Sequence, residues 1–172
     1  MFELMNKLIL LDGPYGIGKT TVARSICNTS NGRNICLDPD EYYNDDAGTL
    51  FWYGWPIPNN SCIKNIIRRE VKKQIHDKNV IIPLTLNSQL YLNDWTNLFR
   101  DIADVKHVIL YANKETLLKR ISNNADRYDK EHALEFLDEN MTYYQRHIEG
   151  AYKLNTSSKT PDEIAKIILQ LL

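Results

Sequence analysis

Two hydrophobic patterns alternate along the chain, and their order predicts the class of fold. Short apolar runs of strand length are followed by longer segments in which apolar residues recur at helical spacing. Strands and helices in this order are typical of a mostly parallel sheet covered by helices. The sequence therefore predicts an α/β domain. Its predicted strands are Lys7 to Leu11, Asn34 to Leu37, Val80 to Leu84, Lys106 to Tyr111 and Tyr152 to Leu154.

The helical segments show which side chains are expected to face the sheet. One apolar stripe runs from Ile63 to Ile75, and another runs from Leu134 to Ile148 and is stopped by Gly150. A last helix is predicted at Thr160-Pro161-Asp162-Glu163, which combines a capping residue, a first-turn proline and a capping-box glutamate. Its apolar positions are Ile164, Ile167, Ile168 and Leu171.

Length, charge and hydropathy narrow the possible partners. The 172 residues suit a single domain spanning 1–172. A formal net charge of −1 gives no electrostatic reason to expect nucleic acid. Apolar runs remain far shorter than the ~18 residues of a membrane span. Cys27, Cys36 and Cys62 lack the spacing of a zinc site. We therefore expect a cytoplasmic protein that binds neither nucleic acid nor a structural metal.

A glycine-rich octet lies between the first predicted strand and a predicted helix over Thr20 to Cys27. It reads Gly13-Pro14-Tyr15-Gly16-Ile17-Gly18-Lys19-Thr20 and fits the pattern GxxxxGK[ST]. Its glycines allow a tight loop whose N–H groups point at phosphates, and the helix N-terminus adds a favourable dipole. Lys19 is expected to contact the β- and γ-phosphates, and Thr20 to bind Mg²⁺. The residues predicted to bind ATP here are Gly13, Tyr15, Gly16, Ile17, Gly18, Lys19, Thr20 and Thr21.

An acidic pair follows the second predicted strand. Asp38-Pro39-Asp40 places two carboxylates one residue apart at the carboxyl edge of the sheet, where parallel sheets bind ligands. Phosphoryl transfer needs one group that orients or deprotonates the attacking hydroxyl and another that supports the metal. We expect Asp40 to face the acceptor and Asp38 the metal. The alternative is a solvated acidic turn, because Glu41 continues the negative run.

The third predicted strand ends without a carboxylate. Many P-loop ATPases place a magnesium-associated Asp at the end of a hydrophobic strand, whereas Val80 to Thr85 contains none. This absence disfavours motor and AAA-type ATPases, and it leaves metal support to Thr20 and Asp38.

Two arginines seven residues apart follow the fourth predicted strand. Arg120 can lay its planar guanidinium against adenine, and Arg127, in a short lid over about 122–131, can neutralise charge on the transferring phosphoryl group. The alternative is that both are surface arginines at helix ends. The predicted catalytic residues are therefore Lys19, Asp40 and Arg127.

An aromatic segment within a predicted acceptor-side insertion, about 41–60, points to a bulky organic acceptor. Its rings can stack on sugars, bases or lipid-like chains, or they can simply cover the sheet edge. Arg68 and Arg69 lie on a basic helix, where a solvated face is favoured over contact with an anionic acceptor. The aromatic residues are Tyr42, Tyr43, Phe51, Trp52, Tyr53 and Trp55.

The phosphate loop, the Asp38-Pro39-Asp40 pair and the spacing of Arg120 and Arg127 resemble P-loop kinases of the shikimate and gluconate kinase type. The segments Ile81 to Thr85 and Lys114 to Arg120 make the chain most similar to the tunicamycin-resistance protein family. This resemblance implies a three-layer, nucleotide-kinase-like fold with strand order 2-3-1-4-5, ATP binding, and antibiotic resistance as a biological role. It also raises peripheral membrane contact through Ile164 to Leu172, for which packing on the sheet is the favoured alternative.

Two functions remain open from the sequence. The leading hypothesis is transfer of the γ-phosphoryl group of ATP to a hydroxyl of a small organic molecule. The rival is an ATP-dependent binding protein that sequesters a toxic ligand without phosphorylating it. A nucleotide kinase that makes nucleoside diphosphates is disfavoured by the short lid.

Overall fold

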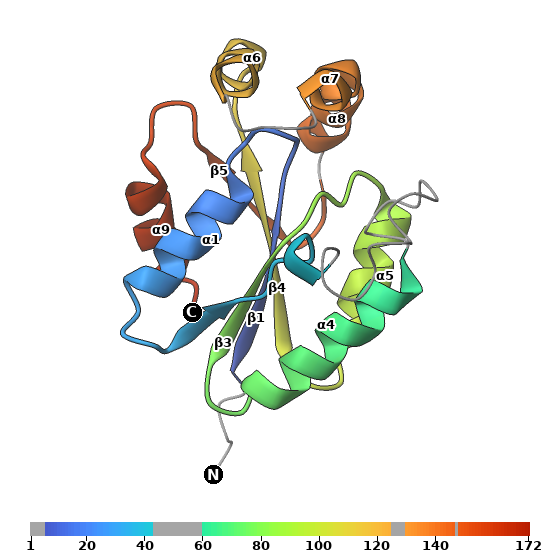
Figure 1. The fold of residues 1–172 in the computed structure, drawn as a ribbon, viewed down its shortest axis with the longest axis vertical. Coiled ribbons are helices and arrows are strands. Elements are labelled where there is room, and N and C mark those ends of the chain that lie inside the picture. The colour runs from blue at the N-terminus through green and yellow to red at the C-terminus, as the bar shows by residue number, and fades with distance from the viewer. Residues whose placement is uncertain (1–5, 43–59, 125–129, 147) are drawn as a thin grey trace.

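A three-layer α/β architecture organises the protein (Figure 1). The structure is a computed structural model that describes residues 6–42, 60–124, 130–146 and 148–172. Its parallel sheet has the order β2-β3-β1-β4-β5, which confirms both the predicted fold class and the strand order implied by the resemblance. The strands are β1 (Lys7–Asp12), β2 (Asn34–Cys36), β3 (Asn79–Pro83), β4 (Asp104–Tyr111) and β5 (Ala151–Asn155).

The central strand β1 is the most apolar and the most buried part of the sheet. Its residues Leu8 to Leu11 are all 0% exposed, because helices cover both faces of a parallel sheet. β1 pairs with β3 through Leu8 opposite Val80, and with β4 through Asp12 opposite Ile109. This burial fixes the end of β1, from which the glycine-rich loop departs.

Helices cover the two faces of the sheet and one of its ends. In Figure 1, α1 and α9 lie on one side of the sheet, α4 and α5 lie on the other, and α6, α7 and α8 lie at the top. Each face has its own apolar core, since successive strand residues point to opposite faces. The helix bounds are α1 (Lys19–Asn28), α4 (Ser61–Gln74), α5 (Gln89–Phe99), α6 (Lys114–Asn123), α7 (Lys130–Glu135), α8 (Leu137–Gln145) and α9 (Pro161–Leu169).

Two helical features differ from the sequence analysis. Helix α5 was not predicted; Ser88 caps it by accepting a hydrogen bond from the Tyr91 N–H, and it buries Leu92, Trp95 and Phe99. The single stripe over Leu134 to Ile148 is two helices, α7 and α8, which meet at Phe136. Within α8, Leu137 packs in the core beside α1, whereas Tyr144, further along the same helix, packs in the core beside α4.

The predicted start of the last helix is confirmed. The Glu163 N–H donates to the Thr160 hydroxyl, and the Glu163 carboxylate accepts from the Thr160 N–H at 2.8 Å, which completes a capping box. Ile164 and Ile168 are buried against the sheet, so the apolar face of α9 is used in the core. Within the four described ranges, no helix is both long enough and apolar enough to cross a membrane.

Candidate active site

The glycine-rich loop runs from the end of β1 to the start of α1, as the sequence predicts. Gly18 is the N-cap of α1 with φ +96°, and no side chain among the described residues caps this helix. A Cβ at Gly18 would meet no described atom within 4 Å. The first N–H groups of a helix have no acceptor within the helix, and those of α1 follow directly on this open position at Gly18. This loop has the space and the donors that a phosphate group requires.

Two other glycines fit the loop tightly against its neighbours. A Cβ at Gly13 would lie 2.5 Å from the carbonyl oxygen of Leu110 on β4, and a Cβ at Gly16 would lie 2.4 Å from Cγ1 of Ile121 on α6. Gly16 also has φ +77°, which L side chains rarely adopt. The loop is therefore held between β4 and α6, and only glycine suits these two positions.

The side chains of the loop and of the first turn of α1 point in different directions. The Lys19 ammonium donates to the carbonyl oxygens of Gly13 at 2.9 Å and Pro14 at 3.0 Å, and it lies 5.9 Å from the centre of the Tyr15 ring. Ile17 is 2% exposed and anchors the loop in the core, whereas Thr21 faces outward from the first turn of α1. The positive charge of Lys19 is thus inside the loop.

The two residues predicted to support a metal are in direct contact. The Thr20 hydroxyl donates to Oδ2 of Asp38 at 2.9 Å, and the Asp40 N–H donates to Oδ1 of Asp38 at 3.1 Å. Asp38 is 4% exposed, and its burial raises the pKa of the carboxyl group, although both hydrogen bonds oppose this increase. Asp40 is exposed. The acidic pair therefore divides into a buried residue beside α1 and an exposed residue at the surface.

This oxygen-rich contact fits Mg²⁺, which prefers oxygen ligands and is usually bound together with phosphate oxygens and waters. Because the Thr20 hydroxyl donates its hydrogen bond to Asp38, the lone pairs of its oxygen can face a cation. Among the described residues, no group of three or more His, Cys, Asp or Glu could hold a metal. The protein part of a magnesium site here would be Thr20 and Asp38.

Arg120 reaches from α6 across the loop to the segment after β5. Its guanidinium donates to the Ile17 carbonyl oxygen at 3.2 Å and to the Thr156 carbonyl oxygen at 2.8 Å. Burial lowers the pKa of this group. The contact with Ile17 puts Arg120 beside the phosphate loop, and stacking on adenine stays a prediction.

Several predicted residues lie outside the described ranges. They include Arg127, half of the predicted lid over 122–131 and most of the predicted insertion over 41–60. Of the aromatic segment, only Tyr42 is described, and it packs against the core beside α4. The catalytic role of Arg127 and the contribution of the other aromatic residues stay predictions.

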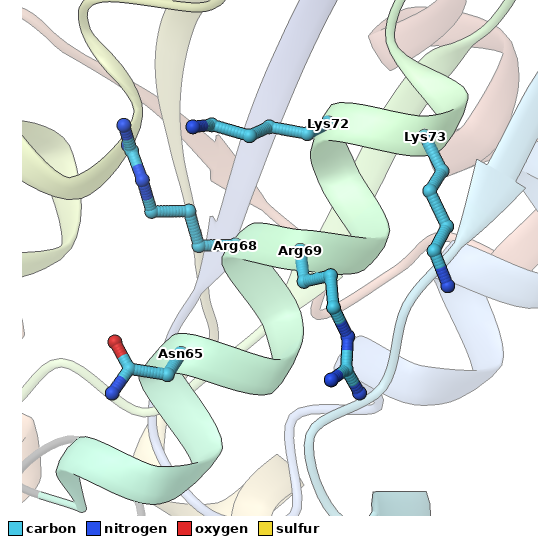
Figure 2. Close-up of a pocket in the computed structure, with 5 residues that line it drawn as sticks. All are labelled: Asn65, Arg68, Arg69, Lys72 and Lys73. Atoms are coloured by element: carbon cyan, nitrogen blue, oxygen red, sulfur yellow. The ribbon is translucent and has the colours of Figure 1, made fainter.

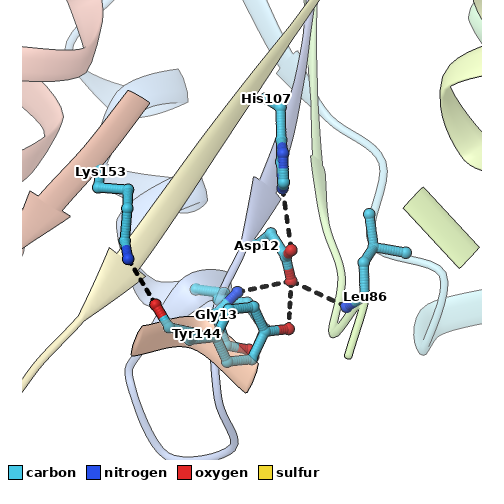
Figure 3. Close-up of polar contacts among 7 residues, drawn as sticks. Asp12, Gly13, Leu86, His107, Tyr144 and Lys153 are labelled. Carbon is cyan, nitrogen blue, oxygen red and sulfur yellow. Dashed lines mark hydrogen bonds and ion pairs between the residues drawn. The ribbon is translucent and has the colours of Figure 1, made fainter. Parts of the chain in front are cut away.

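The sequence analysis missed a buried carboxylate at the head of the loop, shown in Figure 3. Asp12 is 0% exposed, and its Oδ1 accepts hydrogen bonds from the N–H groups of Gly13 and Leu86 and from the Tyr144 hydroxyl. Its Oδ2 lies 2.9 Å from Nε2 of His107, a residue to which no chemistry was assigned. The available signal was an acidic residue that ends an apolar strand directly before the loop.

A cavity of about 390 Å³ opens beside α8 and was also missed. The Tyr143 hydroxyl is buried and has no hydrogen-bond partner within the described parts of the chain. Burial, aided by the charge of Asp12, raises the pKa of Tyr143 to about 12, so its hydroxyl stays protonated. The residues that line the cavity are Asn87, Asp138, Glu139, Thr142, Tyr143 and Arg146.

The basic residues of α4 lie away from these groups. Figure 2 shows them along a shallow cavity of about 440 Å³, lined by Asn65, Arg68, Arg69, Lys72 and Lys73. Arg68 is bound to Asp101 and to the Leu98 carbonyl oxygen. The carboxyl end of α4 leads into the start of β3, so this part of the helix lies toward the sheet edge opposite the loop. A solvated basic face explains these residues best.

The fold and the loop geometry define a P-loop domain of the type found in small-molecule kinases. More particularly, the chain belongs to the AAA domain family, whose sequence profile matches residues 8–149. This match contradicts the expectation that AAA-type proteins are disfavoured. Strand β3 ends without a carboxylate, and the chain still matches the family. The missing carboxylate therefore does not exclude the chain from this family. No curated protein matches the chain in sequence.

Several solved structures share the fold over nearly the whole chain. An APS kinase, CysC, from Mycobacterium tuberculosis, in complex with AMPPNP and APS, has a TM-score of 0.69 at 17% identity and covers 98% of both chains. The Deinococcus radiodurans tunicamycin resistance protein has a TM-score of 0.67 at 15% identity, with 96% of this chain and 95% of that chain covered. A sugar kinase from Janibacter sp. HTCC2649 has a TM-score of 0.67 at 12% identity, with 96% and 93% covered.

Proposed function

We propose that this protein is a phosphotransferase that moves the γ-phosphoryl group of ATP to a hydroxyl of a small organic molecule. The observation that carries the proposal is the open cradle at Gly18, with Lys19 inside the loop and the Thr20–Asp38 pair at its edge. The loop N–H groups and Lys19 would hold the terminal phosphates, and Thr20 and Asp38 would hold Mg²⁺. When bound, the metal would neutralise charge on the phosphate oxygens.

Asp40 is the residue that we assign to the acceptor. It is exposed, and it follows the buried Asp38 at the carboxyl edge of the sheet, so its carboxylate can orient or deprotonate a hydroxyl presented from solution. Arg127 would stabilise charge on the transferring group, as the motif spacing predicts. In this proposal, catalysis is mainly positioning and electrostatic stabilisation, which are the main requirements of phosphoryl transfer.

The acceptor class is supported by the cavity beside α8. Its lining combines an amide, a threonine, carboxylates, an arginine and a tyrosine, which suits a polar molecule with several hydroxyl groups. Similar folds include proteins named sugar kinase, gluconokinase and tunicamycin resistance protein, so sugars and nucleoside antibiotics are the first acceptors to test. We place this activity in the cytoplasm, with ATP as phosphoryl donor and Mg²⁺ as metal.

The proposal is tested in two stages. Calorimetry with MgATP and with a non-hydrolysable analogue establishes nucleotide binding, and absence of binding at millimolar ligand overturns the proposal. A thermal-shift screen of sugars and antibiotics with the analogue present then identifies a ligand, because a ligand of the native state raises the melting temperature. Incubation of that ligand with MgATP, followed by mass spectrometry, should show the gain of one phosphate. A ligand that binds and stays unmodified would instead support sequestration.

A further inference from the structure

The Asp12 carboxylate takes no part in the mechanism above, yet it lies directly before the phosphate loop. A buried carboxylate is costly unless its oxygens are hydrogen-bonded. Figure 3 shows that Asp12 meets this condition through groups from four separate parts of the fold. Its Oδ1 lies 2.7 Å from the Gly13 N–H nitrogen, 2.8 Å from that of Leu86 and 2.6 Å from the Tyr144 hydroxyl, and its Oδ2 lies 2.9 Å from His107.

Two of these contacts fix the backbone around the site. Because the Gly13 N–H donates to Asp12, the loop begins in one orientation, at a glycine whose φ is +149°. The Leu86 N–H fixes the segment between β3 and α5, which also supplies Asn87 to the cavity beside α8. Asp12 therefore holds two backbone segments, the start of the phosphate loop and the segment that supplies Asn87 to the cavity.

A third contact connects α8 to the same carboxylate. Tyr144 is 2% exposed; its pKa is raised well above the ordinary value, by burial first and then by Asp12, so its hydroxyl stays protonated and donates. Lys153 holds the carboxyl end of α8 by donating to the carbonyl oxygens of Tyr144 and Arg146. Tyr143 and Arg146 line the cavity, so Asp12 joins the wall of that cavity to the first residue of the loop.

We propose that Asp12 is a positioning residue for the phosphate loop and that Tyr144 acts through it, so that the placement of α8 sets the affinity for nucleotide. The inference rests on the proposed binding of nucleotide at this loop. It goes further by making nucleotide affinity depend on a hydroxyl from the acceptor side of the molecule.

The test is Tyr144→Phe, which keeps the buried ring and removes only the hydroxyl. The matched control is Tyr152→Phe, the same chemical change at a side chain that is 43% exposed on β5. Dissociation constants for Mg·AMPPNP are measured by calorimetry below the melting temperature of every variant. We expect Tyr144→Phe to weaken binding about fivefold or more, the lower end of typical coupling between sites. The control should remain within about twofold of the wild type.

A double-mutant cycle decides whether Tyr144 acts through Asp12. Asp12→Asn keeps one acceptor oxygen and removes the charge, and we expect the double variant to bind nucleotide no more weakly than Asp12→Asn alone. Additive losses would overturn the route through Asp12. If Asp12→Asn does not fold, the nucleotide affinity of Tyr144→Phe relative to wild type decides whether the Tyr144 hydroxyl influences nucleotide binding.

The outcomes separate this inference from the function on which it rests. A wild-type protein that binds Mg·AMPPNP, with a Tyr144→Phe variant of equal affinity, would overturn the inference and leave the proposed function standing. A Tyr144→Phe variant that melts at a lower temperature but binds nucleotide as tightly as wild type would also overturn the inference, since a purely structural role gives that result. A wild-type protein without nucleotide binding would overturn both.

Discussion

The Thr20 hydroxyl donates a hydrogen bond to Asp38 across 2.9 Å, and this contact joins the first turn of α1 to the chain that leaves β2. The two residues are far apart in sequence, and the parallel sheet brings them together at its carboxyl edge. Asp38 is buried here and Asp40 is exposed, so the two acids of the motif meet different environments.

Removal of the Thr20 hydroxyl should uncouple nucleotide binding from magnesium. Thr20→Val keeps the shape of the side chain but offers no oxygen, whereas Thr20→Ser keeps the hydroxyl and serves as control. We expect Thr20→Val to reduce the Mg²⁺-dependent affinity for ATP by roughly tenfold or more, as for lost metal-site contacts. Calorimetry with and without Mg²⁺ measures the effect. Equal Mg²⁺ dependence in the two variants would remove Thr20 from the metal site.

The stability of the metal-free protein should depend on the ionisation of Asp38. Burial raises the pKa of this carboxyl above its ordinary value of 3.8, so the folded state holds the proton more tightly than the unfolded state. Stability is therefore unaffected below about pH 3.8 and decreases as the pH rises through the folded-state pKa. Asp38→Asn removes this dependence.

Thermal unfolding of wild type and Asp38→Asn from pH 4 to pH 7, in metal-free buffer, measures the difference. We expect the advantage of the variant to grow as the pH rises and to shrink when Mg²⁺ is added, because the metal stabilises the ionised wild type. A difference in melting temperature between Asp38→Asn and wild type that is the same at pH 4 and at pH 7 would show that ionisation of Asp38 has no influence on folding.

A methyl group at Gly16 should destabilise the fold far more than one at Gly32. Both glycines have left-handed backbones, with φ +77° and φ +79°, but a Cβ at Gly16 would overlap Ile121, while one at Gly32 meets no described atom within 4 Å. The strained backbone costs roughly 1–2 kcal/mol in each variant. Overpacking at Gly16→Ala adds about 1–3 kcal/mol. Urea unfolding of Gly16→Ala and Gly32→Ala compares the two free energies, and equal values would contradict the close approach of α6.

Loss of the Asp40 charge should reduce turnover without affecting nucleotide binding. Asp40→Asn keeps the size of the side chain but cannot accept a proton, so we expect a decrease of about 10²–10⁴-fold in kcat. The affinity for Mg·AMPPNP should stay within about twofold. The neighbouring exposed acid Glu41, which pairs with Arg24, provides the control Glu41→Gln. Similar turnover in both variants would remove Asp40 from the mechanism.

The sheet was predictable because burial leaves a strong signal in sequence. β1 and β3 are continuous apolar runs, and the glycine loop marks where the first strand ends. Helix α5 did leave a signal that the sequence analysis overlooked, because its buried residues Leu92, Trp95 and Phe99 recur at helical spacing. The break at Phe136 was also hidden, since apolar residues continue at helical spacing across it, and α7 and α8 share one core through Ala133 and Leu137.

At the candidate site, local motifs were predictable and long-range contacts were not. Gly18, Lys19 and Thr20 form one local motif, and their arrangement follows from the loop alone. The contacts of Asp12 depend on Tyr144, which lies 132 residues away in sequence, and no spacing pattern reveals such a pair. The same holds for the cavity beside α8, because its lining comes from two segments that only the tertiary fold brings together.

Helix α1 begins on a glycine, and none of the described side chains caps it. An anion that occupies this position binds only the folded chain, so phosphate or sulfate in a buffer will raise the apparent melting temperature. Measurements made in phosphate and in Tris would then describe two differently loaded forms of one protein. The choice of buffer is part of the definition of its resting state.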